Sequence, residues 1–144
     1  MTHFTEVLIV EDCPMTIIYL TDFFVKAGYD IQAVKTGASA ISLFGRNPKQ
    51  FGLVILDLEL PDMLGTQVAQ CIRQIEIIDG ISEILIPLVI SSANLTESVK
   101  LAALQSGIQG FFNKPVSEKN KKAMLYMLEL KSLARKSIIV HPVG

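Results

Sequence analysis

The stretch LVILD, Leu53 to Asp57, is a short apolar run that ends abruptly in an acid. VLIVED at positions 7–12 has the same pattern, and in FFNKP at positions 111–115 a short apolar run is followed by a lysine instead. A short apolar run of this kind is typical of a strand that is buried on both faces. If the three strands are parallel, their carboxyl ends lie along one edge of one sheet, where Glu11, Asp12, Asp57 and Lys114 would meet.

The bulk composition predicts a single globular domain. The chain has 144 residues, of which half are hydrophobic and 19% are charged, enough for a core without disulfide support. A net charge of −1 gives no reason to expect nucleic acid or an anionic membrane as a partner. No apolar stretch is long enough to span a bilayer, and the amino terminus lacks the features of a signal peptide. Cys13 and Cys71 have no metal-ligand spacing and are interpreted as free thiols. We therefore expect a cytoplasmic protein, with one domain over residues 1–136 and a short tail over residues 137–144.

Apolar runs alternate with helical patterns along the chain, which predicts an α/β fold with a doubly wound parallel sheet. In such sheets ligands bind outside the carboxyl ends of the strands, where the strand order reverses. Strands are expected at about Val7–Val10, Ile31–Val34, Leu53–Leu56, Leu85–Ser91 and Gly110–Asn113, and helices at about Pro14–Ala27, Ala38–Phe44, Thr66–Ile77, Thr96–Gln105 and Glu118–Lys136. The polar residues Glu11, Asp12, Asp57, Ser92 and Lys114 all follow or end such strands.

The acids at this edge suit metal-assisted phosphoryl chemistry. Adjacent strands lie about 4.8 Å apart, so Asp12 and Asp57 can share one small cation if their strands are neighbours. All-oxygen ligation suits Mg²⁺, which would draw a phosphate oxygen toward the nucleophilic carboxylate of Asp57. Lys114 could then pair with a phosphoryl oxygen, and a hydroxyl at the end of the fourth strand could bind another. Singly, each residue has an ordinary explanation, such as a helix N-cap for Asp12. Their coincidence at one edge favours the functional interpretation.

With these motifs in place, the chain resembles a response-regulator receiver domain from about Glu6 to Leu133. The matching motifs are Glu11-Asp12, the stretch DLELPDMLG at positions 57–65, Ser92-Ala93 and Lys114-Pro115. The resemblance implies a flavodoxin-like sheet of five strands in the order 2-1-3-4-5, with five flanking helices. It also implies a phosphoacceptor of two-component or phosphorelay signalling. Such a domain is not an enzyme acting on a separate substrate, although it assists its own phosphorylation and dephosphorylation.

The resemblance assigns roles to individual residues. Asp57 would accept the phosphoryl group, and Asp12, Asp57 and the backbone carbonyl of Glu59 would bind Mg²⁺. Glu11 would complete the acid pocket, and Lys114 would contact the phosphoryl group. The peptide bond between Lys114 and Pro115 is expected to be cis, as is usual in the family.

The switch hydroxyl requires a choice between Ser91 and Ser92. Neighbouring residues of a strand point to opposite faces, so only one of them can face the phosphoryl group. The family places a small residue directly after this hydroxyl, and Ala93 therefore favours Ser92, with Ser91 as the alternative. Phe111 corresponds to the aromatic residue that moves with the hydroxyl in the family. An ordinary core role for Phe111 is an equally good explanation.

A partner protein is expected to donate the phosphoryl group, because His3 and His141 lie in the terminal segments without the helix of a phosphohistidine domain. The donor would be a histidine kinase or a histidine phosphotransfer protein. The first expected helix is apolar around nearly its whole circumference, more than a one-sided helix needs. We expect Tyr19, Leu20, Phe23 and Phe24 to be core, which leaves Ile17, Ile18 or Val25 as a docking patch. A helix simply covered by the carboxyl-terminal segment is the competing explanation.

Output is expected through a downstream protein target or by passing the phosphoryl group onward. The long connection between Asp57 and Ser92 resembles receivers of hybrid kinases and phosphorelays more than chemotaxis-type single domains. The last helix is expected either to pack on the sheet alone or also to form a homodimer surface together with the fourth helix. Core packing is the more frequent outcome for an apolar stripe of this kind.

Three other classes compete with this interpretation. A nucleotide or flavin binder would place glycines or hydroxyls after the first strand, whereas this chain has two acids and a proline there. An aspartyl phosphatase would need an Asp two residues after the nucleophile, where this chain has Glu59. A pseudo-receiver, which binds proteins without being phosphorylated, is the main alternative, and the complete set of pocket residues argues against it.

Overall fold

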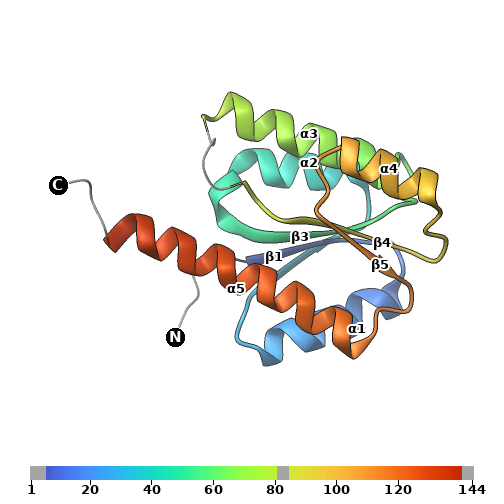
Figure 1. Cartoon of the computed structure of the whole chain (residues 1–144), viewed down its shortest axis with the longest axis horizontal. Helices are drawn as coiled ribbons and strands as arrows, with labels where there is room; N and C mark the ends of the chain where they lie inside the picture. The colour runs from blue at the N-terminus through green and yellow to red at the C-terminus, as the bar shows by residue number, and fades with distance from the viewer. Residues whose placement is uncertain (1–5, 81–84, 141–144) are drawn as a thin grey trace.

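Five parallel strands form one sheet at the centre of the fold (Figure 1). The computed structural model describes residues 6–80 and 85–140, with the side chains of the last helix described as far as Ala134. The strands are β1 (Glu6–Val10), β2 (Ile31–Val34), β3 (Phe51–Asp57), β4 (Leu88–Ser92) and β5 (Gly110–Asn113), in the order β2-β1-β3-β4-β5. All four adjacent pairs are parallel. The predicted flavodoxin-like α/β architecture is therefore confirmed.

Helices cover both faces of the sheet. They are α1 (Pro14–Lys26), α2 (Gly37–Arg46), α3 (Gly65–Ile78), α4 (Glu97–Gln105) and α5 (Glu118–Val140), with a short 3-10 helix, η1, at Pro48–Gln50. In Figure 1 α2, α3 and α4 lie on one side of the sheet, and α1 and α5 lie on the other. Within the described ranges, none of these helices combines the length and apolar character needed to cross a membrane.

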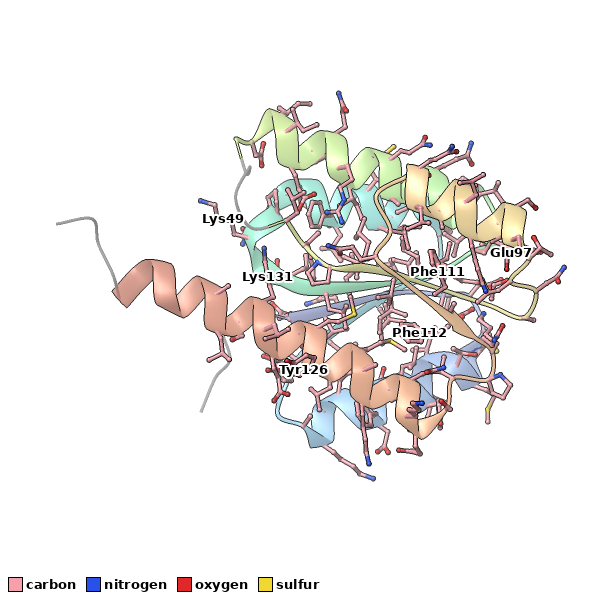
Figure 2. The ribbon with its side chains drawn as sticks, viewed as in Figure 1. Lys49, Glu97, Phe111, Phe112, Tyr126 and Lys131 are labelled. Carbon is pink, nitrogen blue, oxygen red and sulfur yellow. The ribbon has the colours of Figure 1, made fainter. Side chains whose placement is uncertain are left out.

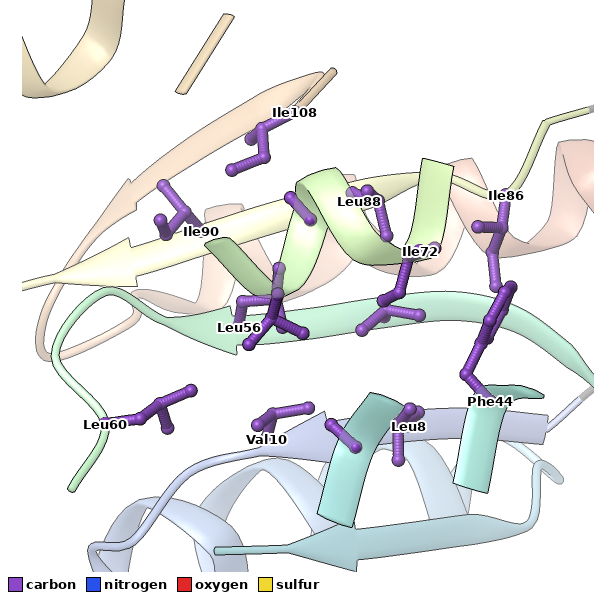
Figure 3. Close-up of a cluster of buried hydrophobic side chains, with 14 of the residues drawn as sticks. Leu8, Val10, Phe44, Leu56, Leu60, Ile72, Ile86, Leu88, Ile90 and Ile108 are labelled. Carbon is purple, nitrogen blue, oxygen red and sulfur yellow. The ribbon is translucent and has the colours of Figure 1, made fainter. Parts of the chain in front are cut away.

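Two apolar clusters, one on each side of the sheet, hold the layers together. Alternate residues of the central strands point to opposite faces, so Leu8 and Leu56 pack under α2 and α3, while Ile9 and Ile55 pack under α1 and α5. Figure 3 shows the first cluster, in which Phe44 of α2 and Ile72 of α3 lie against the strands. Every residue of β3 is buried, as its continuous apolar run predicts. The buried strands fix the position of the sheet edge at which Asp57 lies.

The largest differences between the predicted and the observed element boundaries are at the start of β4 and at the end of α5. β4 begins at Leu88 rather than Leu85, because Pro87 has no N–H to donate to a neighbouring strand. Helix α5 continues to Val140, whereas the sequence predicted its end at Lys136. The β-branched residues after Ser137 have a lower helix propensity than the residues before them, yet the helix continues through them. The rest of the expected tail, residues 141–144, lies outside the described residues, as do His3 and His141. The domain division at residue 136 stays a prediction.

Candidate functional site

Three carboxylates meet at the carboxyl edge of the sheet. Glu11 and Asp12 directly follow β1, and Asp57 is the last residue of β3, the strand beside β1. One carboxylate oxygen from each residue lies within 4.8 Å of the other two. Glu11 and Asp57 are 3% and 9% exposed, whereas Asp12 faces solvent. Sequence positions far apart in the chain are therefore brought together as predicted, in a cluster with two buried acids and one exposed acid.

Lys114 approaches the acids from the far end of the sheet. It follows β5, and its Nζ lies 2.6 Å from Oε1 of Glu11 and 3.1 Å from Oδ1 of Asp57. Its backbone N–H donates a hydrogen bond of 3.0 Å to the carbonyl of Ser92, which ties the residue to the end of β4. The peptide bond between Lys114 and Pro115 is cis, as expected. One ammonium group offsets only one of the three carboxylates, so the cluster keeps an excess of negative charge.

The protonation behaviour of the cluster reflects this crowding. Burial is the largest influence on Glu11 and raises the pKa of its carboxyl, and the negative charge of Asp57 adds to the effect. The Lys114 ammonium and the Cys13 amide hydrogen bond oppose that rise without cancelling it. Burial on its own lowers the pKa of Lys114, but its hydrogen bonds to Glu11 and Asp57 outweigh burial, and the pKa is raised. Lys114 is therefore a permanent cation at neutral pH.

The donor set at this edge fits a hard divalent cation. Carboxylate oxygens are the ligands that Mg²⁺ prefers, and the exposed carboxylate of Asp12 leaves room for the water molecules that this ion retains. Glu59, the third expected ligand through its carbonyl, is exposed in the loop after β3. That loop is closed by a hydrogen bond of 2.7 Å from the Gly65 amide to the Leu58 carbonyl. The residues present therefore suit Mg²⁺ in charge and in ligand type.

Ser92 and Phe111 lie on the same side of the sheet. Ser92 ends β4 in alternation with Leu88 and Ile90, which pack under α3, and Phe111 packs against the same cluster. Figure 2 shows Phe111 and Phe112 on opposite sides of β5. The Ser92 hydroxyl accepts a hydrogen bond of 3.1 Å from the Asn94 amide. The shared side is what a switch composed of these two residues requires.

Ser91 occupies the other side of β4, beside the expected phosphoacceptor. It is the register partner of Asp57, and it is only 2% exposed. In the described part of the chain its hydroxyl is buried without a hydrogen-bond partner. A buried hydroxyl in this state is unusual and asks for an explanation. The choice between Ser91 and Ser92 therefore stays open.

Helix α1 presents part of its apolar surface to solvent beside the site. Ile18 is 63% exposed, whereas Ile17 is half-buried and packs against the apolar cluster under α1. Tyr19, expected to be core, is 41% exposed, because its ring lies at the helix edge and its hydroxyl donates a hydrogen bond of 2.8 Å to the Val116 carbonyl. A hollow of about 360 Å³ separates α1 from the loop after β5, and its lining is Met15, Thr16, Tyr19, Lys114, Pro115 and Val116.

Two polar contacts near the site were not predicted from the sequence. Both oxygens of Asp62 accept hydrogen bonds from α2, from the Gly37 amide at 2.8 Å and the Ala38 amide at 2.9 Å. The Lys121 ammonium lies 3.9 Å from the centroid of the Tyr19 ring. A signal for Lys121 was present, because it shares the three- and four-residue spacing of the buried residues Met124 and Leu128. No comparable periodicity points to Asp62, whose partners are backbone amides.

Comparison of the sequence with known proteins identifies a family to which this site belongs. The sequence model for the response regulator receiver domain matches residues 7–126. The sensor histidine kinase GacS of Pseudomonas protegens is 33% identical over 117 residues, which cover 79% of this chain and 12% of the kinase. The aerobic respiration control sensor protein ArcB of Escherichia coli is 31% identical over 120 residues, covering 83% of this chain and 14% of the sensor. The chain thus spans only a small part of these relatives.

Solved structures give the same result. The signal receiver domain of a putative Luxo repressor protein from Vibrio parahaemolyticus superimposes with a TM-score of 0.78 at 29% identity, covering 95% of this chain and 98% of that one. A second similar structure is the co-crystal of the Saccharomyces cerevisiae histidine phosphotransfer signaling protein Ypd1 with the receiver domain of its downstream response regulator Ssk1. It has a TM-score of 0.80 at 25% identity and covers 92% of this chain and 94% of that one. The chain belongs to the response-regulator receiver-domain family.

Proposed function

We propose that this receiver domain is a phosphoacceptor, in which the carboxylate of Asp57 takes a phosphoryl group from a phosphohistidine of a partner protein. The observation that carries the proposal is the position of Lys114, whose ammonium contacts both Asp57 and Glu11 at the edge where Asp12 also lies. A pseudo-receiver has no need of a half-buried lysine that contacts an acid cluster. Domains of this kind act on themselves, and we propose no separate substrate and no enzymatic turnover.

Transfer of the phosphoryl group from the donor histidine to Asp57 forms one bond and breaks one bond. A carboxylate oxygen of Asp57 forms a bond to phosphorus, the bond from phosphorus to the donor's imidazole nitrogen breaks, and that nitrogen keeps the electron pair. Lys114 remains protonated and is placed to pair with a phosphoryl oxygen that arrives at Asp57. Glu11 stays beside Lys114 and holds the ammonium at the site before the phosphoryl group is present. The chain's own contribution is thus orientation and charge rather than proton transfer.

Asp12, Asp57 and the backbone carbonyl of Glu59 would hold Mg²⁺ in this proposal. A bound divalent cation offsets the repulsion between carboxylates and an incoming phosphoryl group and withdraws charge from phosphorus. Support comes from the carboxylate oxygens within 4.8 Å of one another and from the unbalanced negative charge of the cluster.

We further propose that phosphorylation is sensed by Ser92 and Phe111, which share one side of the sheet. The Ser92 hydroxyl would leave the Asn94 amide and bind the phosphoryl group, and Phe111 would follow it inward. The half-buried state of Phe111 leaves room for such a movement toward burial. Ser91 is the alternative hydroxyl, since it lies beside Asp57.

The proposed donor is a histidine kinase or a histidine phosphotransfer protein, and Ile18 with Ile17 is the proposed contact on α1. Support comes from the exposure of Ile18 beside the site and from the Ypd1–Ssk1 co-crystal, which pairs a phosphotransfer protein with a similar receiver domain. A downstream protein target would bind the switched face. A homodimer through α4 and α5 would use exposed apolar residues such as Leu104 on α4 and Leu130 on α5. The free thiols of Cys13 and Cys71 fit a cytoplasmic setting.

The test is intact mass spectrometry after incubation with Mg²⁺ and acetyl phosphate. We expect the wild type to gain one phosphoryl mass, Asp57→Asn to gain none, and Asp30→Asn, an exposed acid outside the site, to behave as the wild type. Ser92→Ala should keep the modification but lose the change in the Phe111 environment, as seen by NMR, whereas Ser91→Ala should keep both. Absence of the mass gain in a folded wild type, from acetyl phosphate and from a phosphorylated histidine phosphotransfer protein alike, would support the pseudo-receiver alternative.

A further inference from the structure

Lys121 is a buried lysine that the phosphoacceptor chemistry does not use. It lies in the first turn of α5, and only 6% of its side chain is exposed. Its Nζ contacts Oε1 of Glu118 at 2.6 Å and lies 3.9 Å from the centroid of the Tyr19 ring and 4.9 Å from that of Phe23. An apolar residue could fill this place without the cost of burying a charge. A lysine at this buried place points to a task that depends on its charge.

The aromatic ring under this ammonium is tied to the loop that carries Lys114. Tyr19 donates a hydrogen bond of 2.8 Å from its hydroxyl to the carbonyl of Val116, two residues after Lys114. Val116 is only 3% exposed, so this carbonyl has little access to water as an alternative partner. On the other side of the loop, the Lys114 amide is bonded to the Ser92 carbonyl. Lys114 is therefore held from both sides, by β4 before it and by α1 after it.

The Lys121 ammonium lies over the same Tyr19 ring whose hydroxyl makes this second tether. A cation over an aromatic face is attracted to the ring, and the attraction is larger where water is excluded. Burial on its own lowers the pKa of Lys121, but the hydrogen bond to Glu118 and the contact with Tyr19 outweigh it and raise the pKa, so the ammonium stays charged. The chain of contacts thus runs from α5 through α1 to the loop after β5 and ends at the ammonium of Lys114.

We infer that Lys121 is a positioning residue for phosphoryl acceptance, which acts through Tyr19 and Val116 to hold Lys114 against Asp57 and Glu11. This inference rests on the proposed phosphoacceptor function. It also sets the two requirements for a substitute at this position, a positive charge and a stem long enough to reach the Tyr19 ring. Arginine meets both requirements, because it binds aromatic faces at least as well as lysine does.

The experiment compares Lys121→Met, Lys121→Arg and Tyr19→Phe with the wild type, using Lys122→Met as the control at the exposed neighbouring position. The readouts are the phosphorylation rate with acetyl phosphate and Mg²⁺, the midpoint of thermal unfolding, and the hydrogen exchange of the Lys114 amide. Loss of a partly buried cation–aromatic contact should slow phosphorylation by about 3- to 10-fold in Lys121→Met. The unfolding midpoint should stay the same or rise, because methionine replaces a buried charge. Exchange of the Lys114 amide should accelerate, and Lys121→Arg should restore the rate.

Tyr19→Phe keeps the ring and removes the bond to Val116, so it should slow phosphorylation as well. The double variant Tyr19→Phe/Lys121→Met should be no slower than the slower single variant, because both act through one chain of contacts. The inference is wrong if Lys121→Met and Lys122→Met have the same phosphorylation rate and the same exchange of the Lys114 amide. It is also wrong if Lys121→Met is slower only because it is thermally less stable and Lys121→Arg does not restore that stability. If the wild type accepts no phosphoryl group, the proposed function fails, and hydrogen exchange of the Lys114 amide alone tests the inference. Faster exchange in Lys121→Met than in the wild type would then support the inference, and unchanged exchange would overturn it.

Discussion

Substituting alanine at Gly65 and at Gly45 should change stability in opposite directions. Gly65 is the first residue of α3, and a Cβ built there overlaps the backbone carbonyl oxygen of Asp57 and lies 3.3 Å from Cα of Leu58. Gly45 lies inside α2, where an added Cβ would meet only Cδ1 of Ile75, at 3.7 Å, an ordinary contact. The chemical change is the same at both positions, so the surroundings alone decide the sign.

The magnitudes follow from these surroundings. At Gly45, the last residue but one of α2, alanine should stabilise the fold by at most about 0.5–1 kcal/mol, which is the amount by which glycine weakens a helix interior. At Gly65 the overlap must be relieved by moving either the start of α3 or the end of β3, and β3 is buried along its whole length. Overpacking of this kind costs about 1–3 kcal/mol, which exceeds the gain in helix propensity. The displaced group is the backbone of Asp57, so phosphorylation should slow as well.

Urea unfolding followed by circular dichroism measures both changes, and a shift in midpoint at constant slope reports stability alone. Thermal unfolding should show the same order, at roughly 2–4 °C per kcal/mol for a chain of this size. The reasoning fails if Gly65→Ala is as stable as the wild type and accepts phosphate at the wild-type rate. It also fails if both alanine variants move in the same direction.

Two further predictions concern acids outside the pocket. Glu76 is 1% exposed, pairs with Arg73 at 2.6 Å and accepts a hydrogen bond from the Ile86 amide at 2.7 Å, so Glu76→Ala should lower the free energy of unfolding in urea by about 3–5 kcal/mol. Glu76→Gln should cost clearly less, because its amide oxygen still accepts the Ile86 N–H. A loss below about 1 kcal/mol for the alanine variant would contradict this reasoning. The hydrogen bonds from the Ala38 and Gly37 amides lower the pKa of Asp62 in the folded protein. The carboxylate therefore stabilises the fold above its pKa in the unfolded chain, near about 3.9, and this stabilisation is lost as the pH falls through the lower pKa of the folded state. The stability difference between wild type and Asp62→Asn should therefore be constant above about pH 5 and shrink below about pH 4.

The sheet and the acid pocket could be predicted because both depend on local patterns. Each pocket residue follows a short apolar run, and the rules for parallel sheets place the ends of such runs together. The long-range contacts of single side chains could not be predicted in this way. The hydroxyl of Tyr19 meets a carbonyl almost a hundred positions away, and no periodicity encodes that meeting.

The same limit explains the errors at element boundaries. The end of α5 depends on weak helix propensities near Ser137, where several outcomes differ by only fractions of a kcal/mol per residue. The choice between Ser91 and Ser92 needs the register of β4 against β3, which places Ser91 opposite Asp57. Alternation along the strand shows only that the two hydroxyls are on different sides.

The ion pairs of Lys114 have a consequence for how the chain acquires its chemistry. They join Lys114, which follows the last strand, to Glu11 after the first strand and to Asp57 at the end of the third, so closing them requires nearly the whole chain to be in place. Contacts of such long sequence separation carry the largest loop-closure entropy and form late in folding. A newly made or partly unfolded chain would thus possess Asp57 but not its lysine. Competence to accept a phosphoryl group would then be acquired last and lost first, and signalling would be restricted to fully folded molecules.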